Sequence, residues 1–243
     1  HLLPSAGRAQ RLGQPLQSTR QLLRPCADLC GQQGDINLMP TGPLRKASTI
    51  ILYRQHPKPE VYMLQRSPTA SFMPNALVFP GGALDDQDTN EFWQKSTNIN
   101  DDVAGKAIPI DDHRLAHALM VAAVRETFEE AGILLALSHL KSTQAQDLAR
   151  VQLNAGTTSF QQVVEDLGLT LNLAALTFIS RWITPKVERR RFDAYFFLAE
   201  VPSGDLRESA DGNETLKGRW MSPLSILEAH SARKNLLAPP TLR

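Results

Sequence analysis

Three glutamates in the stretch VAAVRETFEEAGIL (121–134) have the residue type and the spacing to do chemistry. At about 100° of rotation per residue of an α-helix, Glu126, Glu129 and Glu130 fall within one arc, and the apolar residues of the stretch fall on the opposite arc. Carboxylates clustered in this way form an oxygen-rich site for a hard cation such as Mg²⁺. A solvated acidic helix face is the alternative interpretation.

Local energetics disfavours glutamates at these positions. The C-terminal end of a helix carries partial negative charge, so each carboxylate in the last turns costs about 0.3–1 kcal/mol where a cation would help. Glu126 and Glu130 are also like charges at i,i+4, which adds about 0.2–0.5 kcal/mol of repulsion. Sequences break such rules most often where function requires it, which favours the metal site, whereas a solvated face is the commonest role of a charge cluster. On these residues alone the two interpretations are equally favoured.

The segments around this helix predict a mixed sheet covered by helices. Apolar runs bounded by turn-forming residues predict strands at 48–53, 60–65, 76–79, 176–183 and 192–201. Helical periodicity predicts a helix from about 112 to 131, capped by Asp111 and ended by Gly132, and a second helix at 159–168. Because strands and helices do not alternate regularly, a mixed sheet is favoured over a doubly wound parallel one.

Composition excludes several classes of protein. The chain has 243 residues, 42% of them hydrophobic, and a formal net charge of +1, so bulk charge gives no reason to expect a nucleic-acid partner. The two cysteines, Cys26 and Cys30, cannot build a disulfide framework or a four-cysteine zinc site. No uninterrupted apolar run has membrane-spanning length, so no membrane partner is expected.

The glutamate helix and the glycine turn before it together resemble the Nudix box, whose family pattern is G-x5-E-x7-R-E-U-x-E-E-x-G-U, with U a bulky apolar residue. Gly82 matches the first glycine, and Asp88 stands where the family usually has Glu. The second half is matched by Arg125, Glu126, Phe128, Glu129, Glu130, Gly132 and Ile133. Between the two halves the family has seven residues, whereas this chain has 36 (Thr89–Val124).

An insertion at this place is typical of one branch of the family, the eukaryotic peroxisomal coenzyme A diphosphatases and their bacterial relatives. Residues 71–82, 181–202 and 211–223 are similar to segments of the same branch, so the resemblance runs from about Ser48 to Ala229. The fold that the resemblance implies is an α/β/α Nudix sandwich with a mixed β-sheet and an insertion inside the box.

The domain organisation follows from this resemblance and from composition. We expect residues 1–46 to be a disordered or flanking leader, residues 47–230 to be the Nudix hydrolase domain with its insertion at 89–110, and residues 231–243 to be a C-terminal tail, complete or truncated. Residues 1–24 contain four arginines and no acid, a composition typical of an organelle transit peptide. The expected location is therefore organellar, or cytoplasmic in a bacterium, and no oligomeric state is predicted.

The resemblance implies hydrolysis of a small nucleotide substrate, a nucleoside diphosphate linked to another moiety, with Mg²⁺ or Mn²⁺ as cofactor. Glu129 and Glu130 are the first expected metal ligands, and the backbone carbonyl of Gly81 or Gly82 is expected to add another. The glycine turn is expected to contact the substrate at Gly82, with a plain turn as the alternative.

Two residues beside these ligands are expected to carry the chemistry. Glu126 is expected either to bind the metal or to take a proton from water. Arg125 is expected to orient Glu126 through a charge-assisted hydrogen bond. The alternative for Arg125 is a surface helix residue that pairs with Glu129 at i,i+4.

The preferred substrate is coenzyme A or an acyl derivative, cleaved to 3′,5′-ADP and a phosphopantetheine product. ADP-ribose and NADH are the rival substrates, and a non-catalytic nucleotide-binding module is the rival function. Coenzyme A-cleaving members of the classical kind carry R-x3-G-x3-FPGG, but here Ser71 and Asn75 stand at the Arg and Gly positions. Coenzyme A recognition thus departs from the family pattern, while Arg125 and the three glutamates of the second half of the box match it.

Further residues are candidates for substrate or metal contacts. The basic residues Lys186, Arg189, Arg190 and Arg191 can grip a terminal phosphate such as the 3′-phosphate of coenzyme A, with a solvated loop as the alternative. The segment 85–110 looks polar and irregular apart from Phe92 and Trp93, which can close over the substrate as a lid or pack as a small core. His113 and His117 at i,i+4 can share a zinc ion, with exposed helix histidines as the alternative.

Overall fold

Strand β1 (Leu44–Arg54) lies at the centre of a mixed sheet, hydrogen-bonded to β2, β4 and β6. The computed structural model describes residues 42–55, 57–70, 73–137, 143–188, 190–201 and 215–242. The other strands are β2 (Glu60–Arg66), β3 (Leu77–Val78), β4 (Gly81–Ala83), β5 (Thr177–Ile183), β6 (Arg191–Glu200) and β7 (Thr215–Met221). Their order is β3-β2-β1-β6-β5, with β4 paired to β1 and β7 to β2. Among these described strands β1 and β6 pair in parallel, and the other pairs are antiparallel. The five predicted strands and the mixed sheet are confirmed.

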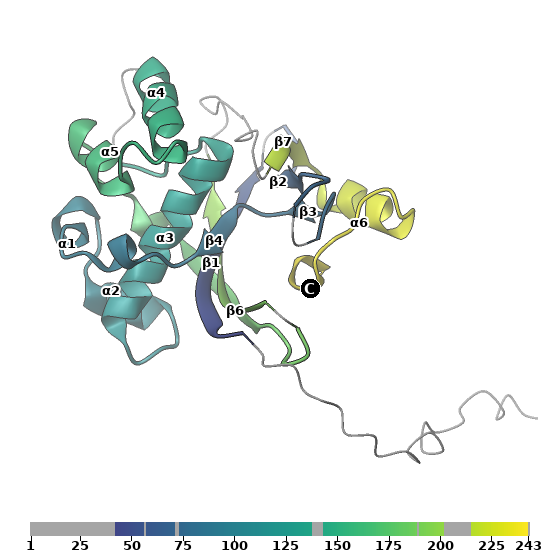
Figure 1. The fold of residues 1–243 in the computed structure, drawn as a ribbon, viewed down its shortest axis with the longest axis horizontal. Helices are drawn as coiled ribbons and strands as arrows, with labels where there is room; N and C mark the ends of the chain where they lie inside the picture. The colour runs from purple at the N-terminus through teal and green to yellow at the C-terminus, as the bar shows by residue number, and fades with distance from the viewer. Residues whose placement is uncertain are drawn as a thin grey trace, which may run out of the picture. The chain divides into compact units, whose positions relative to one another are not determined.

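Helices cover both faces of this sheet (Figure 1). They are η1 (Asp86–Thr89), α1 (Trp93–Ser96), α2 (Asp101–Ala107), α3 (His113–Ala131), α4 (Thr143–Asn154), α5 (Phe160–Asp166), η2 (Leu173–Ala175), α6 (Pro223–Ser231) and η3 (Pro239–Leu242). Side chains of β2 alternate between two cores: Tyr62 and Leu64 pack in the core around α3, and Met63 packs with Ile226 of α6. This arrangement is the expected α/β/α sandwich.

Helix α3 ends at the predicted residue, and its N-cap and its first residue each lie one residue later than predicted. The Oδ1 atom of Asp112, not of Asp111, accepts a hydrogen bond of 3.0 Å from the backbone N–H of Leu115. Gly132 ends the helix with φ of 72°, a left-handed conformation that glycine adopts without strain. The buried hydroxyl of Ser48 on β1 donates to the carbonyl of Leu119 over 2.7 Å, which ties α3 to the sheet.

The insertion is more ordered than the sequence indicates. The segment expected to be irregular forms η1, α1 and α2, and Asn100 caps α2 by accepting 3.0 Å from the N–H of Val103. Trp93 is 1% exposed, packs on Phe160 with ring centroids 5.5 Å apart and donates through Nε1 to the carbonyl of Gln87 over 2.8 Å. The interpretation of Trp93 as part of a lid over the substrate is therefore wrong. The ring is buried by packing, as the alternative interpretation expected.

The two histidines of α3 do not share a site. His117 is 3% exposed, with Nε2 2.9 Å from Thr97 Oγ1 and Nδ1 3.1 Å from Asp101 Oδ1. His113 instead places Nδ1 3.2 Å from Asp102 Oδ1. These separate partners contradict the hypothesis that the two histidines share a zinc ion. The burial of His117 also contradicts the alternative, in which both histidines are exposed on the helix. His117 hydrogen-bonds the insertion to α3.

Ordered packing extends beyond both expected domain boundaries. Strand β1 begins at Leu44, before residue 47, and Leu237 from the expected tail is 4% exposed and bridges to Leu77 of β3. The leader up to residue 41, with both cysteines, lies outside the described residues. In the part of the chain that the structure describes, no helix is both long enough and apolar enough to span a membrane.

Candidate active site

The fold brings the glycine turn to the glutamates of α3. Strand β4 pairs antiparallel with β1, with Gly82 opposite Ser48, and lies against the C-terminal half of α3. The N–H of Gly81 donates to Glu130 Oε2 over 2.9 Å. A Cβ atom added at Gly82 would overlap the carboxylate of Glu126, so glycine lets this carboxylate lie close against the backbone of the turn. The expected proximity of turn and acids across the insertion is confirmed.

Arg125 is the hub of this arrangement. Its guanidinium donates to both carboxylate oxygens of Asp88, from Nε over 2.8 Å and from Nη2 over 2.9 Å. Nη2 also donates to the carbonyl of Ala83 over 3.0 Å. Nη1 donates to Glu126 Oε1 over 2.9 Å and to Glu129 Oε1 over 3.2 Å. One side chain therefore joins β4, η1 and two of the three glutamates.

The burial of this hub decides between the interpretations of Arg125. Arg125 is 4% exposed and Asp88 2% exposed, so the surface-residue alternative is wrong even though the pairing with Glu129 that it assumed is present. The expected hydrogen bond to Glu126 is present as well. Asp88 was not expected to be the buried partner of Arg125, and its place in the box pattern is the one sequence signal for that role.

Burial also shifts the charges of the site. It raises the pKa of Glu126 to about 7, although the charge of Arg125 opposes the rise. Burial raises the pKa of Glu129 and of Asp88 as well, again opposed by Arg125. For Arg125 burial alone would lower the pKa, but the hydrogen bonds with Asp88 and the nearby carboxylates raise it above its ordinary value, so the guanidinium stays charged.

The oxygen donors of this site have the chemistry of a divalent-cation site, but their carboxylates are hydrogen-bonded to Arg125 and to the glycine turn. Among the described residues, no group of three or more His, Cys, Asp or Glu side chains is gathered so that it could hold a metal ion. Glu126 and Glu129 face Arg125, and Glu130 faces the N–H of Gly81. The carboxylates of Asp88, Glu126 and Glu129 nevertheless contact one buried guanidinium, and that of Glu130 lies at the adjoining glycine turn. This excess of negative oxygen donors fits a hard cation such as Mg²⁺ or Mn²⁺.

Other predicted site residues lie on other elements. Lys186 and Arg190 are exposed between β5 and β6, Arg191 donates from Nε to the carbonyl of Thr184 over 3.2 Å, and Arg189 lies outside the described residues. Asn75 adopts φ of 62°, a left-handed conformation that asparagine tolerates better than most residues. Glycine, which the family has at this position, also adopts this conformation without strain, whereas Ser71 lies outside the described residues.

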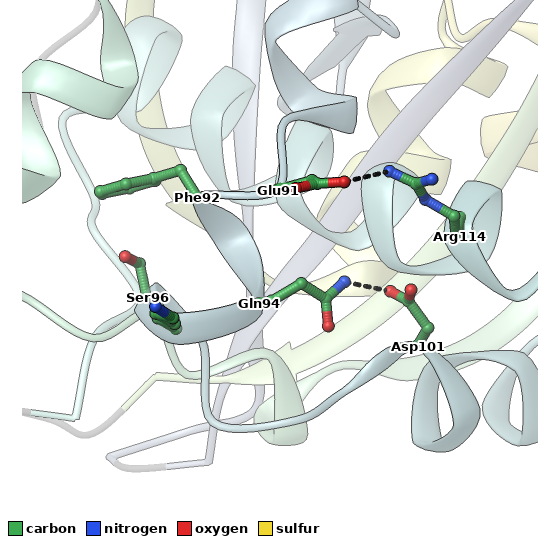
Figure 2. A pocket seen from close by; sticks show the side chains of 7 residues that line it. Glu91, Phe92, Gln94, Ser96, Asp101 and Arg114 are labelled. Carbon is green, nitrogen blue, oxygen red and sulfur yellow. Dashed lines mark hydrogen bonds and ion pairs between the residues drawn. The ribbon is translucent and has the colours of Figure 1, made fainter.

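An open hollow of about 700 Å³ lies away from the glutamates, at the other end of α3. Its walls are Glu91, Phe92, Gln94, Lys95, Ser96, Asp101 and Arg114. Figure 2 shows Glu91 facing Arg114 at 3.9 Å and Gln94 donating to Asp101 over 2.6 Å. Arg114 precedes Glu126 by more than three turns of α3, about 18 Å along the axis. The hollow is therefore not part of the glutamate site.

One contributor that the sequence did not indicate is α4. Arg150 donates from Nε to the carbonyl of Glu129 over 3.0 Å and from Nη2 to the carbonyl of Glu130 over 2.8 Å. Asn154 adds a bond of 3.1 Å from Nδ2 to the carbonyl of Glu129. These contacts join residues about twenty positions apart in the chain, and no local sequence pattern predicts them.

Comparison with known proteins agrees with this geometry. Residues 44–243 match a family model described as the NUDT19 Nudix domain. The chain is 28% identical over 218 residues to acyl-coenzyme A diphosphatase NUDT19 of Xenopus laevis, covering 74% of this chain and 57% of that protein. It is 29% identical over 252 residues to the Homo sapiens protein of the same name, covering 81% and 66%. The chain thus spans less than two thirds of the length of these relatives.

A solved structure gives the same result for the fold. The crystal structure of a NUDIX hydrolase from Alicyclobacillus acidocaldarius is 28% identical in sequence and superposes with a TM-score of 0.67. The match covers 84% of this chain and 90% of that one.

The raised pKa of Glu126 predicts how stability depends on pH. Because its pKa is about 7 in the folded protein and 4.5 ordinarily, the folded state binds more protons than the unfolded state between these values. In metal-free protein the free energy of unfolding should therefore fall as pH rises from about 4.5 to about 7, by about 2–3 kcal/mol from this group. Urea unfolding at a series of pH values measures the slope.

Glu126→Gln should make this slope shallower, because the titrating group is gone. Glu91→Gln is the matched control, since the Glu91 side chain is 87% exposed and the same chemical change should leave the slope as in the parent. Equal slopes for the parent and Glu126→Gln would contradict the assignment.

Proposed function

This chain belongs to the Nudix hydrolase family, and from that premise we propose that it cleaves the diphosphate linkage of coenzyme A or acyl-coenzyme A, giving 3′,5′-ADP and the (acyl)phosphopantetheine product. The observation that carries the proposal is the glutamate cluster held against the glycine turn by the buried Arg125. The names of the NUDT19 relatives support the substrate class, and the proposal extends it to this chain.

The proposed cofactor is Mg²⁺ or Mn²⁺. Glu129 and Glu130, together with Glu126 and the backbone carbonyl of Gly81, are the residues that would hold it, because carboxylate and carbonyl oxygens are the ligands these cations prefer. When bound, such a cation neutralises diphosphate charge and makes water more acidic.

The chain's own residues have distinct proposed tasks. Glu126 accepts a proton from the attacking water, a role that contributes about 10²–10⁴ in rate. Arg125 holds the Glu126 carboxylate in place from Nη1 while Asp88 fixes the other edge of the guanidinium. Gly82 lets the backbone of the turn, and with it the substrate diphosphate, approach Glu126 without a side chain in between.

Substrate preference is proposed to come from the turn between β5 and β6. Coenzyme A carries a 3′-phosphate that ADP-ribose and NADH lack, and the exposed cations Lys186 and Arg190 can bind a phosphate through charge-assisted hydrogen bonds. This difference makes coenzyme A the preferred substrate over the other two.

The catalytic proposal predicts the effect of Glu130→Gln. This variant should lose at least about 100-fold in kcat, because an amide cannot supply the negative oxygen that a cation and a positioned water require. Product formation from coenzyme A in Mg²⁺ measures the effect. Glu91→Gln, an exposed residue of the insertion that lies beside Arg114 at the N-terminal end of α3, should retain parental kcat. Full activity in Glu130→Gln would reject the site.

The substrate proposal predicts an order of specificity. Assays run in parallel on coenzyme A, coenzyme A without its 3′-phosphate, ADP-ribose and NADH should give the highest kcat/KM for coenzyme A. Arg190→Gln should lower kcat/KM for coenzyme A by about tenfold, the value of one charge-assisted hydrogen bond, and should not change it for the form without the 3′-phosphate. Turnover of ADP-ribose alone would overturn the choice of substrate.

A further inference from the structure

The C-terminal end of α3 has backbone carbonyl groups that the helix itself cannot hydrogen-bond. The last four carbonyl groups of an α-helix have no donor within the helix. In α3 the carbonyl of Phe128 receives the N–H of Gly132 over 2.9 Å, and the carbonyls of the residues after Phe128 depend on donors from outside the helix. Helix α3 also has no basic residue in its last turn to offset the negative end of its dipole.

A side chain from α4 supplies both the donors and the charge. The guanidinium of Arg150 donates to the carbonyls of Glu129 and Glu130, and Asn154 gives a second hydrogen bond to Glu129. Arg150 is only 8% exposed, so its positive charge acts with little screening by water. A cation at this end of a helix is stabilising, and it also offsets the carboxylates gathered there.

Gly132 makes room for this contact. A Cβ atom at Gly132 would lie 2.9 Å from Arg150 Nη1, closer than side-chain carbons normally approach. The glycine that ends α3 therefore has a second task besides its left-handed conformation. The helix end, the glycine and the guanidinium form one packed unit, which fixes where the last turn of α3 can lie.

The two carbonyls that Arg150 binds belong to the residues whose carboxylates face the glycine turn and Arg125. Glu130 accepts from the N–H of Gly81 through Oε2, and Glu129 accepts from Arg125 through Oε1. Because the backbone of a last helical turn frays readily, the direction of both carboxylates depends on the bonds that keep this turn helical.

We infer that Arg150 is a positioning residue, which holds the last turn of α3 so that Glu129 and Glu130 present their carboxylates together to a divalent cation. The inference rests on the proposed metal-dependent hydrolysis and adds to it a residue on a separate helix. Groups that orient ligands in this way typically change metal affinity or activity by about 10–100-fold when removed.

The test compares four variants of the full chain with the parent. Arg150→Gln removes the charge and the fork, Arg150→Lys keeps the charge with a single donor group, and Asn154→Ala removes one of two donors to Glu129. Arg114→Gln is the matched control, since Arg114 lies at the other end of α3 and its side chain is 67% exposed. Mn²⁺ affinity without substrate, followed by electron paramagnetic resonance, is the first readout, and kcat and KM for coenzyme A are the second.

We expect Arg150→Gln to bind Mn²⁺ about tenfold more weakly or worse, with a matching loss in kcat and little change in KM. Arg150→Lys should recover part of the affinity, because an ammonium reaches a carbonyl but cannot bridge two in the planar geometry of a guanidinium. Asn154→Ala should lose about twofold or more, the value of a neutral hydrogen bond, and Arg114→Gln should match the parent.

Parental Mn²⁺ affinity in folded Arg150→Gln would overturn the inference. If that variant does not fold, Arg150→Lys decides, and parental affinity there would overturn it equally. If Arg150→Gln binds Mn²⁺ more weakly than the parent but the parent cleaves none of the diphosphates, the inference is supported and the proposed function is rejected. Coenzyme A hydrolysis with unchanged Mn²⁺ affinity in the variant would do the reverse, and a parent that binds no Mn²⁺ would reject both.

Discussion

The buried ion pair between Asp88 and Arg125 is the interaction on which the rest of the site depends. The two residues lie on either side of the insertion, and both are almost fully buried. Breaking a buried pair by removing one partner typically costs about 3–5 kcal/mol, because the remaining charge is left without compensation. Since Arg125 also bonds the carbonyl of Ala83 and the carboxylate of Glu126, the pair fixes the glycine turn, η1 and the catalytic helix relative to one another.

The insertion lengthens the connection between the two halves of the motif without separating them. It folds as short helices that pack beside α3, with Trp93 in the core and His117 bonded to Thr97. Both ends of the connection are thereby held near α3, so the contact between Asp88 and Arg125 does not depend on a flexible loop closing over 36 residues (Thr89–Val124). A split motif is therefore compatible with function because the inserted segment packs into the main core, where Trp93 contacts Phe160 of α5.

Sequence reasoning predicted most of the sheet, the helix α3 with its glycine end, and the meeting of Gly81 and Gly82 with the glutamates. These features have strong local signals: alternating apolar runs, a helical period and a shared motif. The helices of the insertion were missed because segments of four to seven residues carry no measurable period, and their polar caps read as loop composition. The burial of Trp93 and His117 and the contact of Arg150 with α3 depend on tertiary packing, which a single sequence does not encode locally.

The most direct test of this account is a double-mutant cycle on the ion pair. The unfolding free energies of the parent, Asp88→Asn, Arg125→Gln and the double variant, measured in urea without metal, give the coupling energy between the two side chains. The account predicts a coupling energy of about 2–3 kcal/mol, near the upper end for residues in direct contact. A coupling energy close to zero would contradict it, because Asp88 and Arg125 would then stabilise the protein independently.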